Sequence, residues 1–155
     1  LAQYQSITNT PPPAIEVNGA SYSAASSGDG VLGLPFGFTA SSRFVRAFWF
    51  RQFAVAHKTP EEGVQTARHI LNQFDIPPGT VMTEAGGTGE GGGVAGVEIT
   101  QWMSVIDQRN AVMYASTYDH PNLFKVDVKT ACAAANGISY IQMPSMDDIP
   151  ELLPA

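Results

Sequence analysis

The spacing of apolar residues changes from helical to alternating near residue 99, and this change predicts helices followed by strands. Residues 59–74 place apolar side chains on one helical face. Thr59, Pro60 and Glu62 form a typical helix start, with an N-cap, a proline in the first turn and a capping-box glutamate. Beyond residue 99 apolar and polar residues alternate, as they do in strands. The sequence therefore predicts an α+β fold.

The second half of the chain is expected to contain an antiparallel meander. Its three strands are predicted at residues 99–107, 111–118 and 123–128. Large apolar side chains occur on both sides of the first strand, so both faces of the sheet are expected to be covered, one of them by two helices. The remaining predictions are a helical turn at 129–135, a last strand at 138–143 and a loosely packed acidic tail at 147–155.

The first half has fewer local signals. Residues 1–40 are rich in Pro, Ser and Gly and are expected to be extended and loop-like. Ser41 or Ser42 can cap a helix that runs to about His57, and its broad apolar face predicts that the helix is mostly buried. Residues 84–97 contain a glycine-rich run, which predicts a surface loop.

Composition excludes several classes of protein. The net charge is -6 and the 8 Lys and Arg residues are dispersed, so no nucleic acid and no anionic lipid is expected as a partner. Apolar runs stop well short of the roughly 18 residues of a membrane span, so no span is expected. With 1 cysteine, the 155 residues can form neither an internal disulfide nor a multi-thiolate zinc site.

Two motifs that suggest ligand binding lack the necessary context. Residues 87–92 fit the dinucleotide pattern G-x-G-x-x-G, but no helix is predicted directly after them, so a flexible connection is the better interpretation. His57, His69 and His120 lack the paired spacing that zinc-binding helices use. Neither a phosphate site nor a metal site is therefore predicted.

Two side chains remain as candidates for chemistry. Cys132 lies among alanines and is expected to be a small buried residue, and a relay to it through Asp119 and His120 has no positional support. Arg43 lies in the first turn of an apolar helix, where a cation opposes the macrodipole and calls for a partner such as a carboxylate or a reacting group. An ordinary solvated arginine is the alternative. Arg46, one turn later, is interpreted as structural.

Several short motifs follow one another in a recognisable order. They are Gly30-Val31-Leu32-Gly33-Leu34-Pro35, Ser42-Arg43-Phe44-Val45-Arg46, His69-Ile70-Leu71-Asn72, Thr100-Gln101-Trp102 and Thr117-Tyr118-Asp119. In order and spacing they resemble the choloylglycine hydrolase family, which contains bile salt hydrolases and penicillin V acylases. The resemblance covers residues 1–128.

This resemblance implies an αββα sandwich, of which residues 1–155 would be the C-terminal portion and a subunit. Enzymes of the family use an N-terminal cysteine freed by processing. Its thiol attacks an amide carbonyl, its own α-amine acts as base, and the acyl-enzyme is hydrolysed. Arg43 matches the family's arginine in the Ser-Arg-Phe motif near the nucleophile, and is therefore the predicted catalytic residue. This chemistry needs no metal or organic cofactor.

The departures from the family pattern also carry implications. The sequence begins with Leu1 and not with cysteine, Cys132 does not correspond to the nucleophile, and Phe36-Gly37 replaces the more usual Gly-Asp. The expectation is a heterodimer made by autoproteolytic processing, in which a partner N-terminal chain carries the nucleophilic cysteine. A higher oligomer of this heterodimer is compatible with the same expectation. The alternative is a non-catalytic binding or assembly module that retains the sandwich elements.

The class of substrate follows from the resemblance alone. Family members hydrolyse small-molecule amides such as bile salts, phenoxyacetyl penicillins, acyl homoserine lactones and other fatty amides. Four aromatic residues could line an acyl pocket or lie in the core: Tyr22, Phe36, Phe38 and Trp49. Processing and the frequent export of family members favour a periplasmic or extracytoplasmic location.

Overall fold

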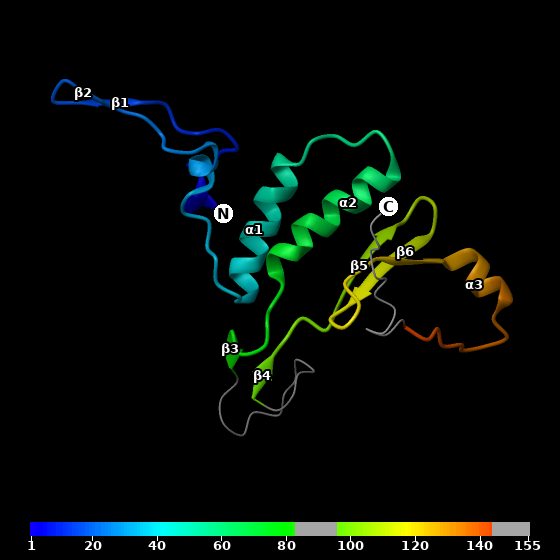
Figure 1. Ribbon diagram of the computed structural model, residues 1–155. Helices are drawn as coiled ribbons and strands as arrows, with labels where there is room; N and C mark the ends of the chain where they lie inside the picture. Colours follow the sequence, from blue (N-terminus) through cyan, green and yellow to red (C-terminus); the bar gives the residue numbers. More distant parts are fainter. Residues whose placement is uncertain (83–95, 144–155) are drawn as a thin grey trace, which may run out of the picture. The chain divides into compact units, whose positions relative to one another are not determined.

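The computed structural model describes residues 1–82 and 96–143 (Figure 1). By their contacts the residues divide into two compact units, one spanning Leu1–Ala56 and the other beginning at His57. Among the described residues, no helix has both the length and the apolar character needed to cross a membrane.

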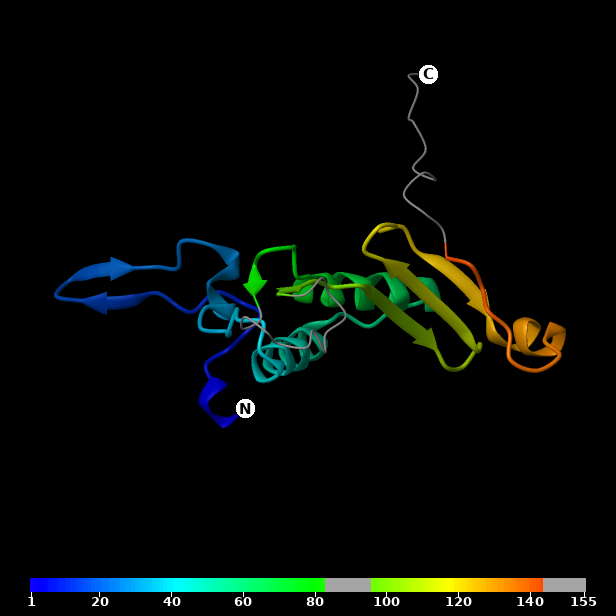
Figure 2. The same ribbon diagram turned by 90° about the horizontal axis from the view of Figure 1, so that it is seen from below.

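The first unit contains a hairpin within the segment that was predicted to be extended and loop-like. Its elements are η1 (Ala2–Tyr4), β1 (Ile15–Val17), β2 (Ala20–Tyr22), η2 (Ser27–Val31) and α1 (Ala40–Phe53). β1 and β2 pair antiparallel, and Asn18 and Gly19 between them both have positive φ, 53° and 78° (Figure 2). An Asn-Gly pair of this conformation is the preferred two-residue hairpin turn. The Asn18-Gly19 dipeptide is therefore the sequence feature from which this hairpin could have been predicted.

A small core holds the first unit together. Ile7, Leu34 and Val45 are buried there. The partly buried residues packed against them are Tyr4, Val31, Trp49, Phe50 and Phe53. The segment before β1 is tied to η2 by a hydrogen bond of 2.8 Å from the Thr8 amide to the Gly30 carbonyl.

Helix α1 differs from its prediction in its cap and its burial. Thr39 caps it, because its hydroxyl oxygen accepts a hydrogen bond of 3.2 Å from the Ser42 amide. The prediction of a cap at Ser41 or Ser42 was therefore wrong by two residues or more. The helix is also not mostly buried: only Val45 and Arg46 are, and Phe44 is 62% exposed.

The second unit begins with helix α2, whose start is as predicted. Its elements are α2 (Pro60–Leu71), η3 (Asn72–Phe74), β3 (Val81–Met82), β4 (Val97–Glu98), β5 (Trp102–Asp107), β6 (Val112–Thr117), β7 (Phe124–Asp127) and α3 (Val128–Ala134). The Thr59 hydroxyl accepts from the Glu62 amide at 3.3 Å. The Glu62 carboxylate accepts from the Lys58 amide, one residue before the cap. Local capping chemistry therefore fixes where α2 starts.

Strands β5, β6 and β7 form the predicted antiparallel meander in that order. β5 starts at Trp102 and not at residue 99, because Thr100 is bound elsewhere. Its hydroxyl accepts from the Ile76 amide at 2.9 Å, and its own amide donates to the Ile76 carbonyl at 3.3 Å. The short pair β3–β4 was not predicted. Most of the predicted loop at 84–97 lies outside the described residues, and Val97 belongs to β4.

One face of this meander is left open, contrary to the prediction that both faces are covered. Helix α2 packs along β5, where Met103 and Val105 are half-buried (Figure 2). Trp102 and Ile106 alternate with them along the strand and are 63% and 59% exposed. Successive side chains point to opposite faces of a sheet, so these two residues belong to the other face. Within the described residues, that face is apolar and incompletely covered.

The predictions for the C-terminal segment were partly right. Asp127 caps α3, accepting from the Thr130 amide at 2.8 Å, so the predicted helical turn is present. The predicted strand at 138–143 is absent, and Ile138 and Tyr140 are 89% and 92% exposed. A strand needs a neighbour to pair with, and the described residues supply none for this segment. The predicted tail at 147–155 lies outside the described residues.

The turn between β5 and β6 makes a pH-dependent contribution to stability. Asp107 accepts hydrogen bonds from the Asn110 side-chain amide at 2.6 Å and from the Asn110 backbone amide at 3.1 Å. These bonds, the side-chain bond first, hold the pKa of Asp107 below its usual value. The contribution is therefore present above the unfolded-state pKa of about 3.9 and is lost as pH falls through the lower folded-state pKa.

We expect Asn110→Ala to raise the pKa of Asp107 toward its usual value, as measured by NMR titration of the carboxyl carbon. The pKa of Asp127 is lowered by a separate bond to Thr130, so it should remain low in the same variant and serves as the internal control. An Asp107 pKa that stays low after the substitution would contradict the assignment of its cause.

Candidate functional site

Arg43 lies in the first turn of α1 with its side chain exposed. Its amide donates to the Thr39 carbonyl at 3.0 Å, which is the first bond of the helix. Within the described part of the chain, its guanidinium has neither a hydrogen bond nor an ion pair. A cation in this place opposes the helix dipole. The structure thus presents Arg43 as an accessible group whose charge is available to an anion.

Arg46, one turn later, is a buried structural residue, as predicted. It is 2% exposed, and its Nη1 donates to the carbonyl oxygens of Pro35 at 2.5 Å and Gly37 at 2.9 Å. The guanidinium carbon lies 6.0 Å from the centre of the Phe36 ring. Burial lowers the pKa of Arg46, and the positive charge of Arg43 lowers it further. The two arginines are therefore close enough to repel each other.

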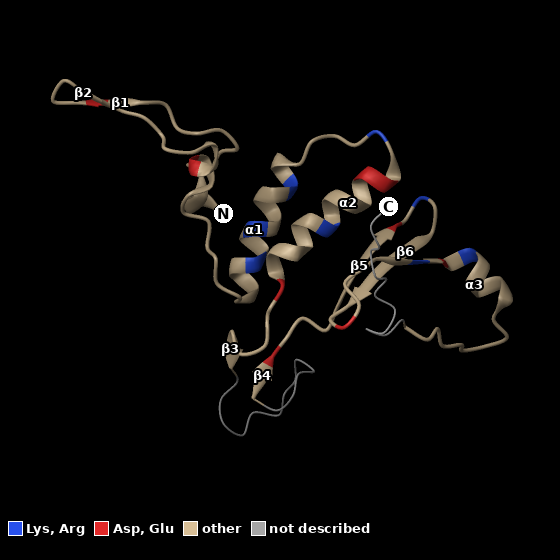
Figure 3. Cartoon of the chain, viewed as in Figure 1, with Lys and Arg blue, Asp and Glu red and all other residues tan. Residues whose placement is uncertain are grey.

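Helix α1 is cationic within an acidic protein. Arg43, Arg46 and Arg51 all lie on it, and it contains no Asp or Glu (Figure 3). The net charge of the whole chain is -6. Arg43 and Arg46 lie in the first two turns of α1, whereas Arg51 lies in its last, so the positive charge that attracts anionic groups is concentrated at the start of the helix. Its start is therefore the best-supported place for the binding of a negatively charged or polarised group in the first unit.

The aromatic residues considered for an acyl pocket fall into two groups. Trp49 packs against the core of the first unit and stacks near Phe53, with ring centres 5.4 Å apart. Phe38 is half-buried, whereas Phe36 and Tyr22 are 75% and 57% exposed. Trp49 is therefore a core residue, whereas Phe36 adjoins the buried Arg46 and is accessible.

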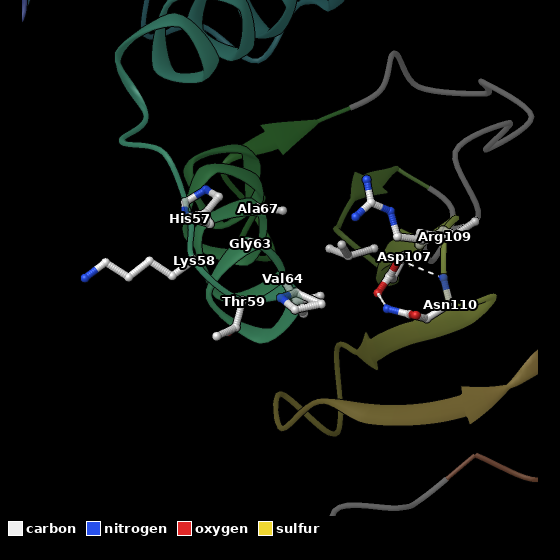
Figure 4. A pocket seen from close by; sticks show the side chains of 12 residues that line it. His57, Lys58, Thr59, Gly63, Val64, Ala67, Asp107, Arg109 and Asn110 are labelled. Carbon is white, nitrogen blue, oxygen red and sulfur yellow. Dashed lines mark hydrogen bonds between the residues drawn. The ribbon is translucent and has the colours of Figure 1, made fainter.

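A cavity of about 490 Å³ lies between the start of α2 and the β5–β6 turn (Figure 4). His57 and Arg109 line it from opposite sides, while the Lys58 side chain points away from it. Asp107, also in its wall, is bound to Asn110. The cavity therefore brings the Arg109 guanidinium and the His57 imidazole together with apolar side chains of α2 and β5.

A second cavity of about 300 Å³ lies farther along α2. Arg68 lines it and donates through Nη2 to the Pro121 carbonyl at 3.1 Å, which ties α2 to the turn before β7. Trp102 and Tyr118 contribute aromatic surface to the same wall.

The histidines and the cysteine do not form a site in the described residues. Nowhere in residues 1–82 and 96–143 do three or more His, Cys, Asp or Glu side chains gather as metal ligands. His69 is exposed, and His120 is 9% exposed with Nδ1 at 3.2 Å from the Asn122 carbonyl oxygen. Cys132 is exposed on the short helix α3, so the prediction of a small buried residue was wrong.

Comparisons with known proteins agree with this architecture. Residues 1–137 match the linear amide C-N hydrolases, choloylglycine hydrolase family. The chain is 24% identical to the bile salt hydrolase/transferase of Clostridium perfringens over 83% of its own length and 36% of that protein. It is 45% identical over 67 residues to an uncharacterized protein of Paramecium bursaria Chlorella virus 1, covering 43% of this chain and 24% of that protein.

A solved structure shows the fold. A variant of the conjugated bile acid hydrolase from Clostridium perfringens superposes with a TM-score of 0.76 at 22% identity, over 98% of this chain and 44% of that chain. The chain thus spans less than half the length of these relatives, and the predicted α+β fold of a partial sandwich is confirmed. Because the family match covers residues 1–137, far more than half of the sequence, this chain belongs to the choloylglycine hydrolase family of linear amide C-N hydrolases.

Proposed function

We propose that this chain is the C-terminal part of an enzyme that hydrolyses linear amide C–N bonds, with its nucleophilic cysteine on a partner chain. The family match over residues 1–137 is the observation that carries the proposal. Bile salts, penicillin V and other N-acyl amides are the proposed class of substrate. A relative that acts on bile salts by name, from Clostridium perfringens, supports that class.

In the proposed reaction the cysteine thiolate attacks the amide carbonyl carbon and the carbonyl oxygen becomes an oxyanion. Collapse of this intermediate breaks the C–N bond, the amine leaves with the proton that the cysteine's α-amine took from the thiol, and water then hydrolyses the thioester. Arg43 would stabilise negative charge on the thiolate or on the reacting group. Its exposed guanidinium, without a bond in the described residues, is suited to that role.

The open face of the β5–β7 sheet supports the proposal of a partner chain. Trp102 and Ile106 on that face are more than half exposed. Large apolar side chains on one sheet face are typical of a surface that another protein segment covers. The outer edges of β5 and β7 also have no strand neighbour among the described residues. A second part of the same sandwich would cover such a face.

The test is the intact mass of the native material under denaturing conditions, with N-terminal sequencing of each species. The proposal expects a co-purifying chain that begins with cysteine. One longer chain beginning with cysteine and containing this sequence would overturn the two-chain arrangement and leave the hydrolase assignment. A single folded species beginning at Leu1, inactive on penicillin V and glycine-conjugated bile salts, would favour the binding or assembly module.

A further inference from the structure

The loop that precedes α1 is held from both of its ends. Before the cap, the carbonyl groups of Pro35 and Gly37 both accept hydrogen bonds from Nη1 of Arg46. After it, the Thr39 hydroxyl donates to the Ser42 hydroxyl at 2.9 Å, and its oxygen accepts from the Ser42 amide. The segment 35–42 is therefore connected through Arg46 to the body of the helix that it enters.

These contacts determine the position of the Arg43 backbone. Its amide donates to the carbonyl of Thr39, so the position of the cap sets the position of the first helical turn. Gly37 lies close to that turn, because a Cβ atom on it would be 3.4 Å from the Ser42 hydroxyl oxygen. A shift of the loop would thus move the backbone of Arg43, and with it the guanidinium.

The positive charge of Arg46 also affects the position of the Arg43 side chain. Arg46 is buried, whereas Arg43 is exposed, and their like charges repel. Repulsion from the buried cation disfavours any arrangement in which the Arg43 guanidinium folds back along the helix. It therefore favours the solvent-facing arrangement in which Arg43 can meet an anion.

We infer that Arg46 is a positioning residue, which acts through Arg43 by tying the loop at 35–37 to helix α1. The inference rests on the proposed function, in which Arg43 contacts the reacting groups. Arg46 itself is 2% exposed, so the proposed role is to act through Arg43 and not through contact with substrate. A methionine at this position would fill similar space but could not bond the Pro35 and Gly37 carbonyls.

The first test is a double-mutant cycle in the complete enzyme, with kcat and KM measured on penicillin V and a glycine-conjugated bile salt. Because a displacement of about 1 Å can cost roughly 10²-fold in rate, we expect Arg46→Met to lower kcat/KM by about 10²-fold. In the Arg43→Ala background the same change should lower it by less than about 3-fold, since residues that act as a unit are not additive. Equal losses in both backgrounds would overturn the inference.

Two further variants separate positioning from a loss of folding. Arg46→Lys keeps a cation with donors that can reach carbonyl groups, so it should recover part of the lost kcat. Arg51→Met changes an exposed arginine of the same helix and should leave kcat/KM within about 2-fold, as surface substitutions do. A lysine variant as poor as the methionine variant, with the same thermal stability, would count against the hydrogen-bonding role.

A measurement independent of activity distinguishes this inference from the proposed function. Backbone amide exchange over residues 34–43 should be faster in Arg46→Met than in Arg51→Met, because only the former releases the loop. Faster exchange in an enzyme with no activity on either substrate would sink the proposed function and leave the loop attachment intact. Unchanged exchange would overturn the inference whatever the activity.

Discussion

Replacing Arg43 with alanine in the complete enzyme should lower kcat/KM by about 10²–10³-fold, the usual loss when one group that stabilises developing negative charge is removed. The thermal midpoint should hardly change, because the Arg43 side chain is exposed and has no hydrogen bond within the described residues. Removing a cation from the first helical turn even relieves a small unfavourable interaction with the dipole. Steady-state kinetics and thermal unfolding of the same preparation would measure both effects.

Arg51→Ala is the matched control for this variant. Arg51 is exposed on the same helix but in its last turn, so the change removes the same side chain away from the cap. We expect its kcat/KM to stay within about 2-fold of the wild-type value, as for most surface substitutions. An Arg43→Ala enzyme as active as the Arg51→Ala enzyme would remove Arg43 from the catalytic site.

Gly30→Ala should cause the largest loss of stability in the first unit. A Cβ atom on Gly30 would overlap the Thr10 carbonyl oxygen and lie 2.7 Å from the Thr8 carbonyl oxygen. Both obstacles are backbone atoms, which cannot turn away as a side chain does. The Gly30 carbonyl also accepts the bond from Thr8 that ties the N-terminal segment to η2. Overpacking of this kind typically costs about 1–3 kcal/mol in free energy of unfolding, and backbone obstacles place Gly30→Ala toward the upper end.

Gly28→Ala provides the comparison, because a Cβ atom there would meet only the Ser26 hydroxyl oxygen at 3.8 Å. That distance is an ordinary van der Waals contact, so the free energy of unfolding should change by less than about 1 kcal/mol. Denaturant unfolding of both variants would measure the difference. Two alanine variants of equal stability would show that the segment 8–10 does not pack against Gly30.

The elements that could be predicted from the sequence are those with local causes. Thr59 and Pro60 fixed the start of α2, and the alternation of residues 102–117 fixed two paired strands. The predicted strand at 138–143 has the right composition but no neighbour among the described residues. Pairing depends on distant backbone groups, and residue-by-residue patterns do not contain that information.

The candidate site also has one part that could be predicted from the sequence and one part that could not. Arg43 could be singled out from its place in the first turn of an apolar helix and from the motif around it. The contacts of Arg46 with Pro35 and Gly37 could not, because they join a side chain to carbonyl groups 11 and 9 residues earlier. Residues differ in their side chains, but all of them have the same backbone carbonyl group. The residue types in a sequence therefore do not show which carbonyl will accept such a bond.

Two of the antiparallel pairs are closed by short turns, and this makes their formation fast. Asn18 and Gly19 alone separate β1 from β2, and residues 108–111 alone separate β5 from β6. Pairs closed over so few residues lose little chain entropy, and hairpins of this kind form in about 1–10 μs. In the proposed two-chain enzyme, the slow step would then be the association of the two chains. Refolding time would accordingly depend on protein concentration.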